Sequence, residues 1–302
     1  MAQAWLDWQE PGCAAWQRLL SGQRAALHQG WSYGEALRAS GVTVQRLILR
    51  EPGDRALACA QIGLRRPFRL LRAAFLLRGP VWLDPAARPE LEPALLTGIR
   101  RRFPRTALIW APEAATAHGR RPVMTAYSTV WLDLSAGLEP LRRGLAANWR
   151  NALRRAERSQ LVVGREVAGP SVDWVLDRNE AYRRQIGYHG PDRAFLARLA
   201  QTAAASGELL LLLARAVGEP VAGIMIVRHG AAATYEVGYV SPGGRELRAT
   251  HLLLWHAIGL LTAQGTRWLD LGGVATDRSP GIARFKLGLG GELETLAGTF
   301  LL

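Results

Sequence analysis

Lys286 is the single lysine among 38 lysine and arginine residues. It follows Phe285 in the glycine-rich segment GIARFKLGLGGE, residues 281–292. Lysine differs from arginine because its ammonium is a compact point charge on a flexible stem, and because its pKa falls readily on desolvation. Lys286 is therefore a candidate for stabilising developing negative charge or for accepting a proton. The alternative is a surface lysine retained by chance.

The segment LRRGLAANWRNALRRAERSQ, residues 141–160, is strongly basic and has a helical pattern. Apolar residues recur every four positions and predict the buried face of one helix; they are Leu141, Leu145, Trp149 and Leu153. The opposite face carries Arg143, Arg150, Arg154 and Arg158. Guanidinium groups suit phosphate oxygens, so this face is a candidate phosphate-binding surface, with a solvated surface as the alternative.

Aromatic side chains form a third set of candidates, Trp31, Tyr33, Tyr235 and Tyr239. The first two lie among glycines at the start of a predicted helix in HQGWSYGEALR, residues 28–38. The last two are four positions apart in a predicted strand, so we expect both on one face and Glu236 on the other. SPGGRELRAT, residues 241–250, lies where a strand meets a helix and is a candidate phosphate site at the helix N-terminus. Packing, capping and turn formation are the alternatives.

Composition and the absence of several known motifs reduce the number of possible functions. The net charge of +13 and the pI of about 11.0 favour an anionic partner such as RNA, a phosphorylated substrate or a membrane surface. The absence of HExxH, Walker and strand–helix GxGxxG motifs argues against metallohydrolase, kinase and dinucleotide-binding functions. Cys13 and Cys59 match no metal spacing and are expected to be packing residues. The start of the chain lacks a secretory signal pattern, which favours the cytoplasm.

The elements that must position these residues follow the same order twice. Three strands are predicted at 208–240, then an apolar helix at 249–264 and a strand at 267–273. The first half repeats this order more loosely between residues 44 and 112, which indicates an internal duplication. We expect an α+β fold of two lobes, residues 1–135 and 136–302.

Six segments, taken together, resemble the Fem family of tRNA-dependent aminoacyltransferases, which extend peptidoglycan stem peptides. They are HQGWSYGEALRASG, LRGPVWLD, NWRNALRRAERSQLVV, YEVGYVS, WLDLGGV and GIARFKLGLGGE, and they span nearly the whole chain. The resemblance implies two tandem GNAT-like lobes, with Phe285 and Lys286 matching the family's Phe-Lys pair beside the reacting amine. The chain lacks room for the coiled-coil arm of some members.

The resemblance also implies substrates and partners. The donor would be aminoacyl-tRNA, with no metal and no bound cofactor, and the arginine face would contact its phosphates. The acceptor would be a UDP- or lipid-linked peptide, in the cytoplasm or at the inner membrane surface, with its diphosphate held by Arg38 and Arg184. Trp31, Tyr33, Tyr235 and Tyr239 are the other candidate substrate-binding residues.

Two other functions remain open. An acyl-CoA-dependent N-acyltransferase on the same fold would use acetyl-CoA with a sugar, polysaccharide or peptide acceptor. SPGGRELRAT does not reproduce the usual acetyl-CoA loop, Gln/Arg-x-x-Gly-x-Gly/Ala. A non-catalytic protein that binds RNA or a membrane surface would need the arginine face alone, and it would leave Lys286 unexplained.

Overall fold

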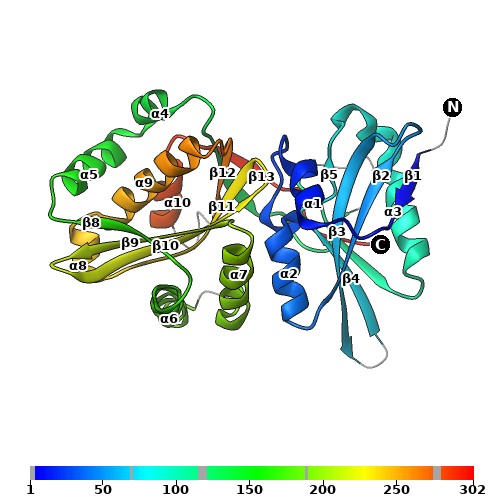
Figure 1. Ribbon diagram of the computed structural model, residues 1–302, viewed down its shortest axis with the longest axis horizontal. Coiled ribbons are helices and arrows are strands. Elements are labelled where there is room, and N and C mark those ends of the chain that lie inside the picture. The colour runs from blue at the N-terminus through cyan, green and yellow to red at the C-terminus, as the bar shows by residue number, and fades with distance from the viewer. Residues whose placement is uncertain (1–3, 69–70, 115–120, 188–189, 275–279) are drawn as a thin grey trace. The chain divides into compact units, whose positions relative to one another are not determined.

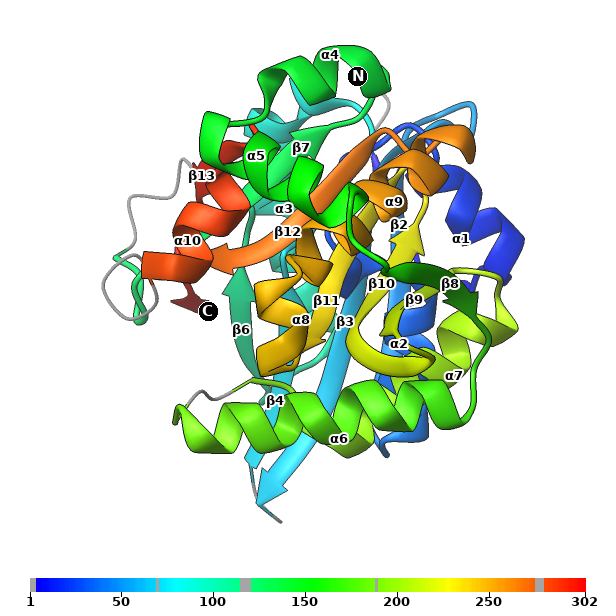
Figure 2. The same ribbon diagram turned by 90° about the vertical axis from the view of Figure 1, so that its left-hand side faces the viewer.

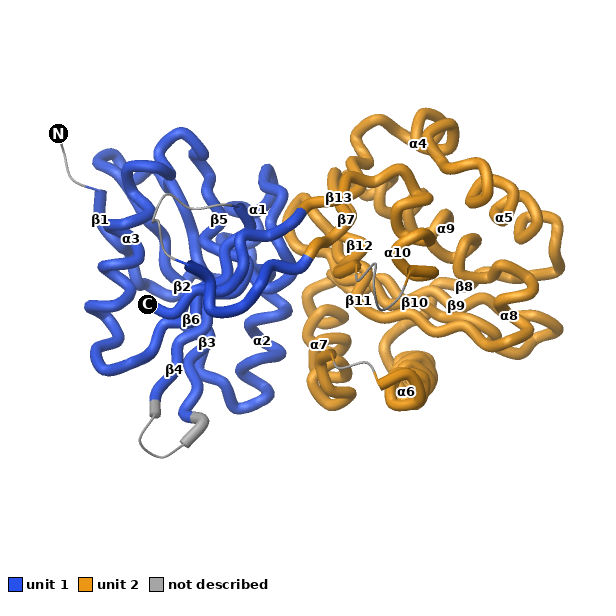
Figure 3. The backbone as a smooth tube through the Cα atoms, turned by 180° about the vertical axis from the view of Figure 1, so that it is seen from behind, with its two compact units in different colours: residues 1–127, 295–302 blue, residues 128–294 orange. Residues whose placement is uncertain are grey.

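The computed structural model describes residues 4–68, 71–114, 121–187, 190–274 and 280–302. They form two compact units, unit 1 with residues 1–127 and 295–302 and unit 2 with residues 128–294 (Figure 3). Each unit is one mixed sheet with helices on both faces, so the predicted α+β class is confirmed. No helix in these described ranges is both long and apolar enough to span a membrane.

Unit 1 is built on the strand order β1-β2-β3-β4-β6-β14, with β5 paired to β3. Its strands are β1 (Trp5–Asp7), β2 (Thr43–Arg50), β3 (Ala56–Phe68), β4 (Leu71–Leu77), β5 (Val81–Trp82), β6 (Ala107–Ala111) and β14 (Phe300–Leu301). Its helices are α1 (Cys13–Leu20), α2 (Trp31–Ala39) and α3 (Arg88–Arg102), with short 3-10 turns at Leu27–Gln29 and Pro85–Ala87. Alternation along β2 explains the two layers, because Leu47 packs with α3 whereas Ile48 packs with Trp16 of α1.

Unit 2 is built on the strand order β13-β7-β12-β11-β10-β9-β8. Its strands are β7 (Ser128–Asp133), β8 (Val162–Glu166), β9 (Leu209–Ala216), β10 (Glu219–His229), β11 (Ala232–Val240), β12 (Trp268–Val274) and β13 (Glu292–Thr295). Its helices are α4 (Leu138–Gly144), α5 (Ala147–Glu157), α6 (Pro170–Gln185), α7 (Arg193–Ala205), α8 (Pro242–Glu246), α9 (Ala249–Ala263) and α10 (Pro280–Leu287). Helices α5, α9 and α10 lie on one face of the sheet, and α6 and α7 cover the other (Figures 1 and 2).

The two sheets repeat one pairing pattern. In unit 1, β2, β3 and β4 are antiparallel neighbours, and β6 returns parallel to β4 after α3. In unit 2, β9, β10 and β11 are antiparallel neighbours, and β12 returns parallel to β11 after α9. The duplication predicted from element order is therefore present in the strand pairing. As predicted, α9 is a buried helix, with seven of its residues in the core.

The division between the units differs from the expected 135/136 boundary. β7 pairs antiparallel with β12, so the chain enters unit 2 at Ser128. The last strand, expected in the second lobe, pairs with β6 of unit 1. Phe300 is buried there, with its ring centroid 5.6 Å from that of Trp110. Each sheet is thus completed by a strand from the other half of the chain.

Candidate active site

Phe285 and Lys286 lie on α10, which is hydrogen-bonded to the α5 segment at two points. The Trp149 Nε1–H donates to the Phe285 carbonyl at 3.1 Å, and the Ala146 N–H donates to the Gly288 carbonyl at 2.9 Å. Gly288 packs so closely that a Cβ there would lie 2.8 Å from the Trp149 ring. The FKLG sequence is thereby held against α5.

The Lys286 ammonium lies against strand β12. Its side chain is half-buried, and Nζ donates a hydrogen bond to the Gly273 carbonyl at 2.9 Å. Burial lowers the pKa of Lys286 from 10.5 to about 8, although the charges of Asp270 and Glu236 oppose this effect. With a pKa of about 8, the group is mainly a cation at pH 7 and releases its proton as the pH rises through 8.

Bulges in two adjacent strands shape the surroundings of Lys286. On β12 the register with β7 shifts between Asp270 and Gly273, and Gly272 between them has φ +77°. On β11, Tyr235 pairs with Ile226 and Val237 pairs with Met225, so Glu236 is an additional residue opposite β10. Bulges bend strands and redirect side chains, and they are common beside active sites.

The β11 bulge corrects the prediction that Tyr235 and Tyr239 share a face. Tyr235 packs into the core under α5 and α9, whereas Tyr239 contacts Trp174 of α6 across the sheet, at 5.5 Å between ring centroids. The extra residue, Glu236, reverses the alternation between the tyrosines. Burial raises the pKa of Tyr235 to about 12, so its hydroxyl stays protonated at neutral pH.

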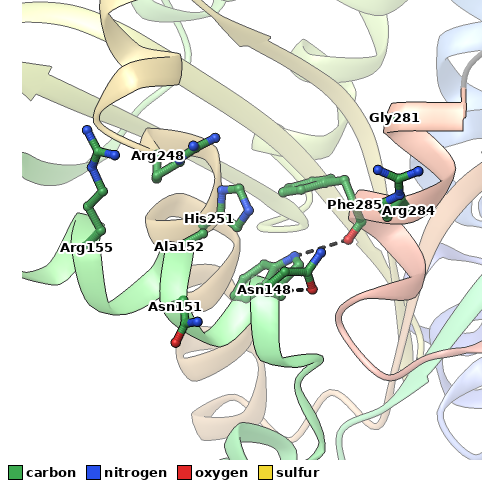
Figure 4. A pocket seen from close by; sticks show the side chains of 10 residues that line it. Asn148, Asn151, Ala152, Arg155, Arg248, His251, Gly281, Arg284 and Phe285 are labelled. Carbon is green, nitrogen blue, oxygen red and sulfur yellow. Dashed lines mark hydrogen bonds between the residues drawn. The ribbon is translucent and has the colours of Figure 1, made fainter.

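A cavity of about 530 Å³ opens beside Phe285, between α5, α10 and the start of α9 (Figure 4). Trp149, His251 and Phe285 form its aromatic wall, with the His251 ring centroid 4.8 Å from Trp149 and 4.9 Å from Phe285. Polar groups line the rest of the cavity: Asn148, Asn151, Arg155, Arg248 and Arg284.

The charge of this cavity is positive. Arg155, Arg248 and Arg284 line it without an acidic residue among its described lining. Burial, together with the charge of Arg248, lowers the pKa of His251 to about 4, so His251 is neutral at pH 7. Arg248 is the N-cap of α9 and has a left-handed backbone conformation, φ 61° and ψ 31°. The positive end of the helix dipole adds to the three guanidinium charges, and the cavity suits an anion.

The basic segment 141–160 is two helices where one was predicted. Helix α4 ends at Gly144, Leu145 and Ala146 have extended backbones, and α5 begins at Ala147. The break is explained by the Ala146 N–H, which bonds to the Gly288 carbonyl instead of continuing a helix. A bidentate ion pair between Arg142 and Glu157, at 2.8 and 2.7 Å, joins the two pieces.

The predicted apolar face nevertheless points inward. Leu145, Trp149 and Leu153 are buried, and Leu141 packs against the same core. Three of the four predicted arginines, Arg143, Arg154 and Arg158, are exposed. The fourth, Arg150, is half-buried and donates to the Arg143 carbonyl at 3.0 Å.

In unit 1 the structure places Arg38, Trp31 and Tyr33 on α2. Arg38 donates to Glu35, Glu10 and the Val44 carbonyl at 2.9, 2.8 and 3.0 Å. Its acidic partners also bind the buried Arg46, whose guanidinium lies 3.8 Å from the Trp31 ring centroid. Tyr33 packs on His28, with ring centroids 4.8 Å apart. Arg38 and Trp31 therefore belong to one network around the buried Arg46 guanidinium.

Arg184, the other arginine expected at the acceptor, lies near the end of α6 in unit 2. Its guanidinium pairs with Glu180 at 2.7 Å, and 78% of its side chain is exposed. It does not line the cavity beside Phe285.

Sequence reasoning missed part of the cavity. Arg284 and His251 match no motif in the sequence, and they come together only because α9 and α10 meet α5. Arg155, which follows Arg154 in the basic segment, also lines the cavity. Arg248, which lines the cavity, belongs to SPGGRELRAT, the segment predicted as a candidate phosphate site. Among the residues that the structure describes, no group of three or more His, Cys, Asp or Glu side chains could hold a metal ion.

Lys286→Met is expected to raise the stability of the protein at pH 7. The folded pKa of about 8 lies below the unfolded value of 10.5, so the cost of the buried charge is fully present below pH 8 and disappears as the pH rises to about 10.5. We expect a gain of about 1–2 kcal/mol in the free energy of unfolding, after allowance for the lost bond to Gly273. Urea unfolding of both proteins at pH 7 and pH 10.5 measures it, and a gain that is equal at the two pH values would contradict this origin.

Comparison with known proteins identifies the fold. Residues 143–287 match the family model described as an acetyltransferase (GNAT) domain. A search of the curated proteins finds no match.

Solved structures match nearly the whole chain. FemX is 12% identical with a TM-score of 0.81, and the match covers 98% of this chain and 96% of FemX. A tandem GNAT protein from the clavulanic acid biosynthesis pathway is 14% identical with a TM-score of 0.55, covering 99% and 98%. The C-terminal domain of an Agrobacterium fabrum protein, described as a lysylphosphatidylglycerol synthetase, is 15% identical with a TM-score of 0.55, covering 95% and 93%. The Fem-like resemblance of the sequence is therefore confirmed in its fold: this chain has the tandem GNAT-like fold of FemX.

Proposed function

We propose that this chain is an aminoacyltransferase that moves an aminoacyl group from aminoacyl-tRNA to an amine of a UDP- or lipid-linked peptide. The observation that carries the proposal is the half-buried Lys286 ammonium at the Gly273 carbonyl, next in sequence to Phe285, which lines a cationic cavity. The FemX fold and the match to a domain of a lysylphosphatidylglycerol synthetase, a protein named for aminoacyl transfer to a lipid, support it.

The reaction needs stabilisation of one negative oxygen. The neutral acceptor amine adds to the ester carbonyl, which forms the new C–N bond and places negative charge on the carbonyl oxygen. Collapse breaks the C–O bond to the tRNA ribose, whose oxygen takes up the proton that the amine loses. In the proposal the Lys286 ammonium lies beside the developing oxyanion, where a fixed charge stabilises the transition state without stabilising the substrate equally.

The cavity would hold the donor. Single-stranded RNA is recognised by positive charge along its backbone and by stacking of its bases on aromatic side chains. The arginines Arg155, Arg248 and Arg284 supply the charge, and the Trp149–His251–Phe285 wall supplies aromatic surface. We assign this cavity to the terminal nucleotides of the tRNA acceptor end, with the exposed arginines Arg143, Arg154 and Arg158 contacting phosphates further along.

For the acceptor we retain Arg184 as the candidate ligand of the diphosphate, because its guanidinium is largely exposed. Arg38 is less suited, since it already donates to three acceptors in unit 1. In this proposal the protein works in the cytoplasm, and a lipid-linked acceptor would bring it to the inner membrane surface.

A second candidate, acyl-CoA-dependent N-acylation, is favoured by the match of residues 143–287 to an acetyltransferase domain. The phosphates of CoA would suit the same arginines at the start of α9. We rank it second because the connection from β11 to α9 contains an additional short helix, α8, in place of the usual acetyl-CoA loop pattern.

The deciding experiment offers the purified protein two labelled donors, aminoacyl-tRNA and acetyl-CoA, with UDP-linked and lipid-linked muropeptides and simple amines as acceptors. The proposal expects label to appear in an amide from aminoacyl-tRNA. Transfer from acetyl-CoA alone would establish the second candidate. Lack of transfer from either donor, with RNA binding intact, would favour a binding protein.

A further inference from the structure

Asp270 is a buried carboxylate in the middle of the unit 2 sheet. It lies on β12 with no exposed surface, and its Oδ1 accepts hydrogen bonds from the Thr129 Oγ1–H at 2.5 Å and from the Gly272 N–H at 2.8 Å. Thr129, on the neighbouring β7, is also fully buried. Burial of a carboxylate is costly unless hydrogen bonds compensate for its lost hydration. A group of this kind in an apolar sheet requires an explanation beyond packing.

The hydrogen bonds of Asp270 fix the backbone that holds Lys286. The bond to the Gly272 N–H spans the β12 bulge, where the register with β7 shifts between Asp270 and Gly273. The next residue, Gly273, supplies the carbonyl that accepts from Lys286 Nζ. A Cβ at Gly272 would lie 3.5 Å from that Nζ, so only a residue without a side chain leaves the space beside the ammonium open here.

The charges around Lys286 come from each neighbouring strand. Asp270 on β12 and Glu236 on the bulge of β11 both favour the ammonium form. Helix α10 contributes the like charge of Arg284, two residues away in sequence, and burial of the Lys286 side chain opposes the ammonium form. Glu236 acts on Lys286 from a second strand through its charge, whereas Asp270 combines charge with a hydrogen bond that spans the β12 bulge.

We propose that Asp270 is a positioning residue, which sets the β12 bulge through Thr129 and Gly272 and so holds the Lys286 ammonium in place at the Gly273 carbonyl. The inference rests on the proposed function only for its effect on turnover. The expected effect of Asp270 on the position and charge of Lys286 does not depend on any reaction.

The single lysine makes this effect measurable. Trace labelling with acetic anhydride across a pH series, followed by mass analysis of the peptide that contains Lys286, gives the pH at which this amine is half-reactive, without donor or acceptor. Asp270→Asn keeps the shape and removes the charge, and it is expected to lower this midpoint by about 1 pH unit or more. It is also expected to reduce kcat about tenfold at pH 6.5, where Lys286 is protonated in the unmodified protein.

Glu236→Gln is the matched variant, because it removes one charge near Lys286 and leaves the Asp270 hydrogen bonds in place. It is expected to lower the labelling midpoint as well but to lose less turnover at pH 6.5 than Asp270→Asn. If the two variants lose equal turnover, Asp270 acts through charge alone, and the positioning role is wrong. An unchanged labelling midpoint in Asp270→Asn would also overturn it.

Two variants of Thr129 test the proposal even if Asp270→Asn fails to fold. Thr129→Val removes the hydroxyl that binds Asp270, and Thr129→Ser keeps it. The proposal expects a lowered labelling midpoint in the valine variant and a restored one in the serine variant, with circular dichroism to verify folding. Equal midpoints in these two variants contradict the proposal. A shifted midpoint in a protein that transfers no aminoacyl group would leave the positioning role standing and refute the proposed function.

Discussion

Lys286→Met is expected to lower kcat for aminoacyl transfer about 100-fold or more, at saturating donor and acceptor. Removal of one group that stabilises an oxyanion typically costs a factor of about 10² to 10³ in rate. The structure provides the physical basis, because Nζ is held at the Gly273 carbonyl in a half-buried position where charge interacts strongly. Single-turnover kinetics with preformed aminoacyl-tRNA would measure the chemical step directly.

Lys286→Arg is the informative control for shape, since it keeps a charge that does not titrate. We expect a similar loss of turnover, because the planar guanidinium is wider and requires several acceptors where the structure shows one carbonyl. Both variants should fold and bind tRNA as before. Turnover near normal in the methionine variant would remove Lys286 from the mechanism.

The pH profile separates the two chemical roles of this lysine. With a pKa of about 8, an ammonium that stabilises the oxyanion loses effect as pH rises through 8, whereas a proton acceptor gains effect over the same range. The proposal therefore expects kcat to fall above pH 8. A rise through this range that is lost in the methionine variant would assign Lys286 as the base.

Replacement of Arg155, Arg248 and Arg284 by glutamine is expected to raise KM for aminoacyl-tRNA about 100-fold, with a smaller effect on kcat. The three side chains are exposed, so each charge-assisted hydrogen bond is taken as about 1 kcal/mol, and the loss of three corresponds to a factor of about 100. If each arginine neutralises one phosphate, the slope of log K against log salt should also flatten by about 2. Binding measured at several salt concentrations tests both expectations.

Two further variants, each with three arginines replaced by glutamine, serve as controls for this experiment. Arg18, Arg121 and Arg165 are exposed arginines dispersed over the chain, and their replacement removes the same charge without touching the cavity. The second control, the face variant, replaces three exposed arginines of the basic segment, Arg143, Arg154 and Arg158. We expect this variant to flatten the slope of log K against log salt as well. A cavity variant that behaves like the dispersed variant would refute the assignment of the cavity to the donor. An unchanged slope in the face variant would make that face an ordinary solvated surface.

The sequence was sufficient for the fold because its signals were local and repeated. Three short strands, an apolar helix and another strand can be recognised in each half, and the FK segment marked α10. The errors came from single residues that change a strand or helix without a compositional signal. Glu236 is an additional residue in β11, and the bulge it forms places Tyr235 and Tyr239 on opposite faces of the sheet. The Ala146 N–H donates to the Gly288 carbonyl, and the predicted single helix is interrupted at that point.

The cavity was beyond sequence reasoning for a different reason. Its three arginines come from α5, the start of α9 and α10, and neither spacing nor composition indicates that these meet. Arg38 shows the same limit, since it matches a motif in the sequence but is paired with Glu10 and Glu35 around the buried Arg46. Tertiary partners decide whether an arginine remains available to a ligand.

The exchange of strands between the two halves of the chain has a consequence for biosynthesis. Residues 295–302, which contribute β14 to unit 1, leave the ribosome after all of unit 2 has been made. Until then β6 has an unpaired edge, and the place of Phe300 beside Trp110 is empty. The amino-terminal unit is therefore the last to be completed during translation, and a premature stop near residue 294 would damage the half of the protein that was synthesised first.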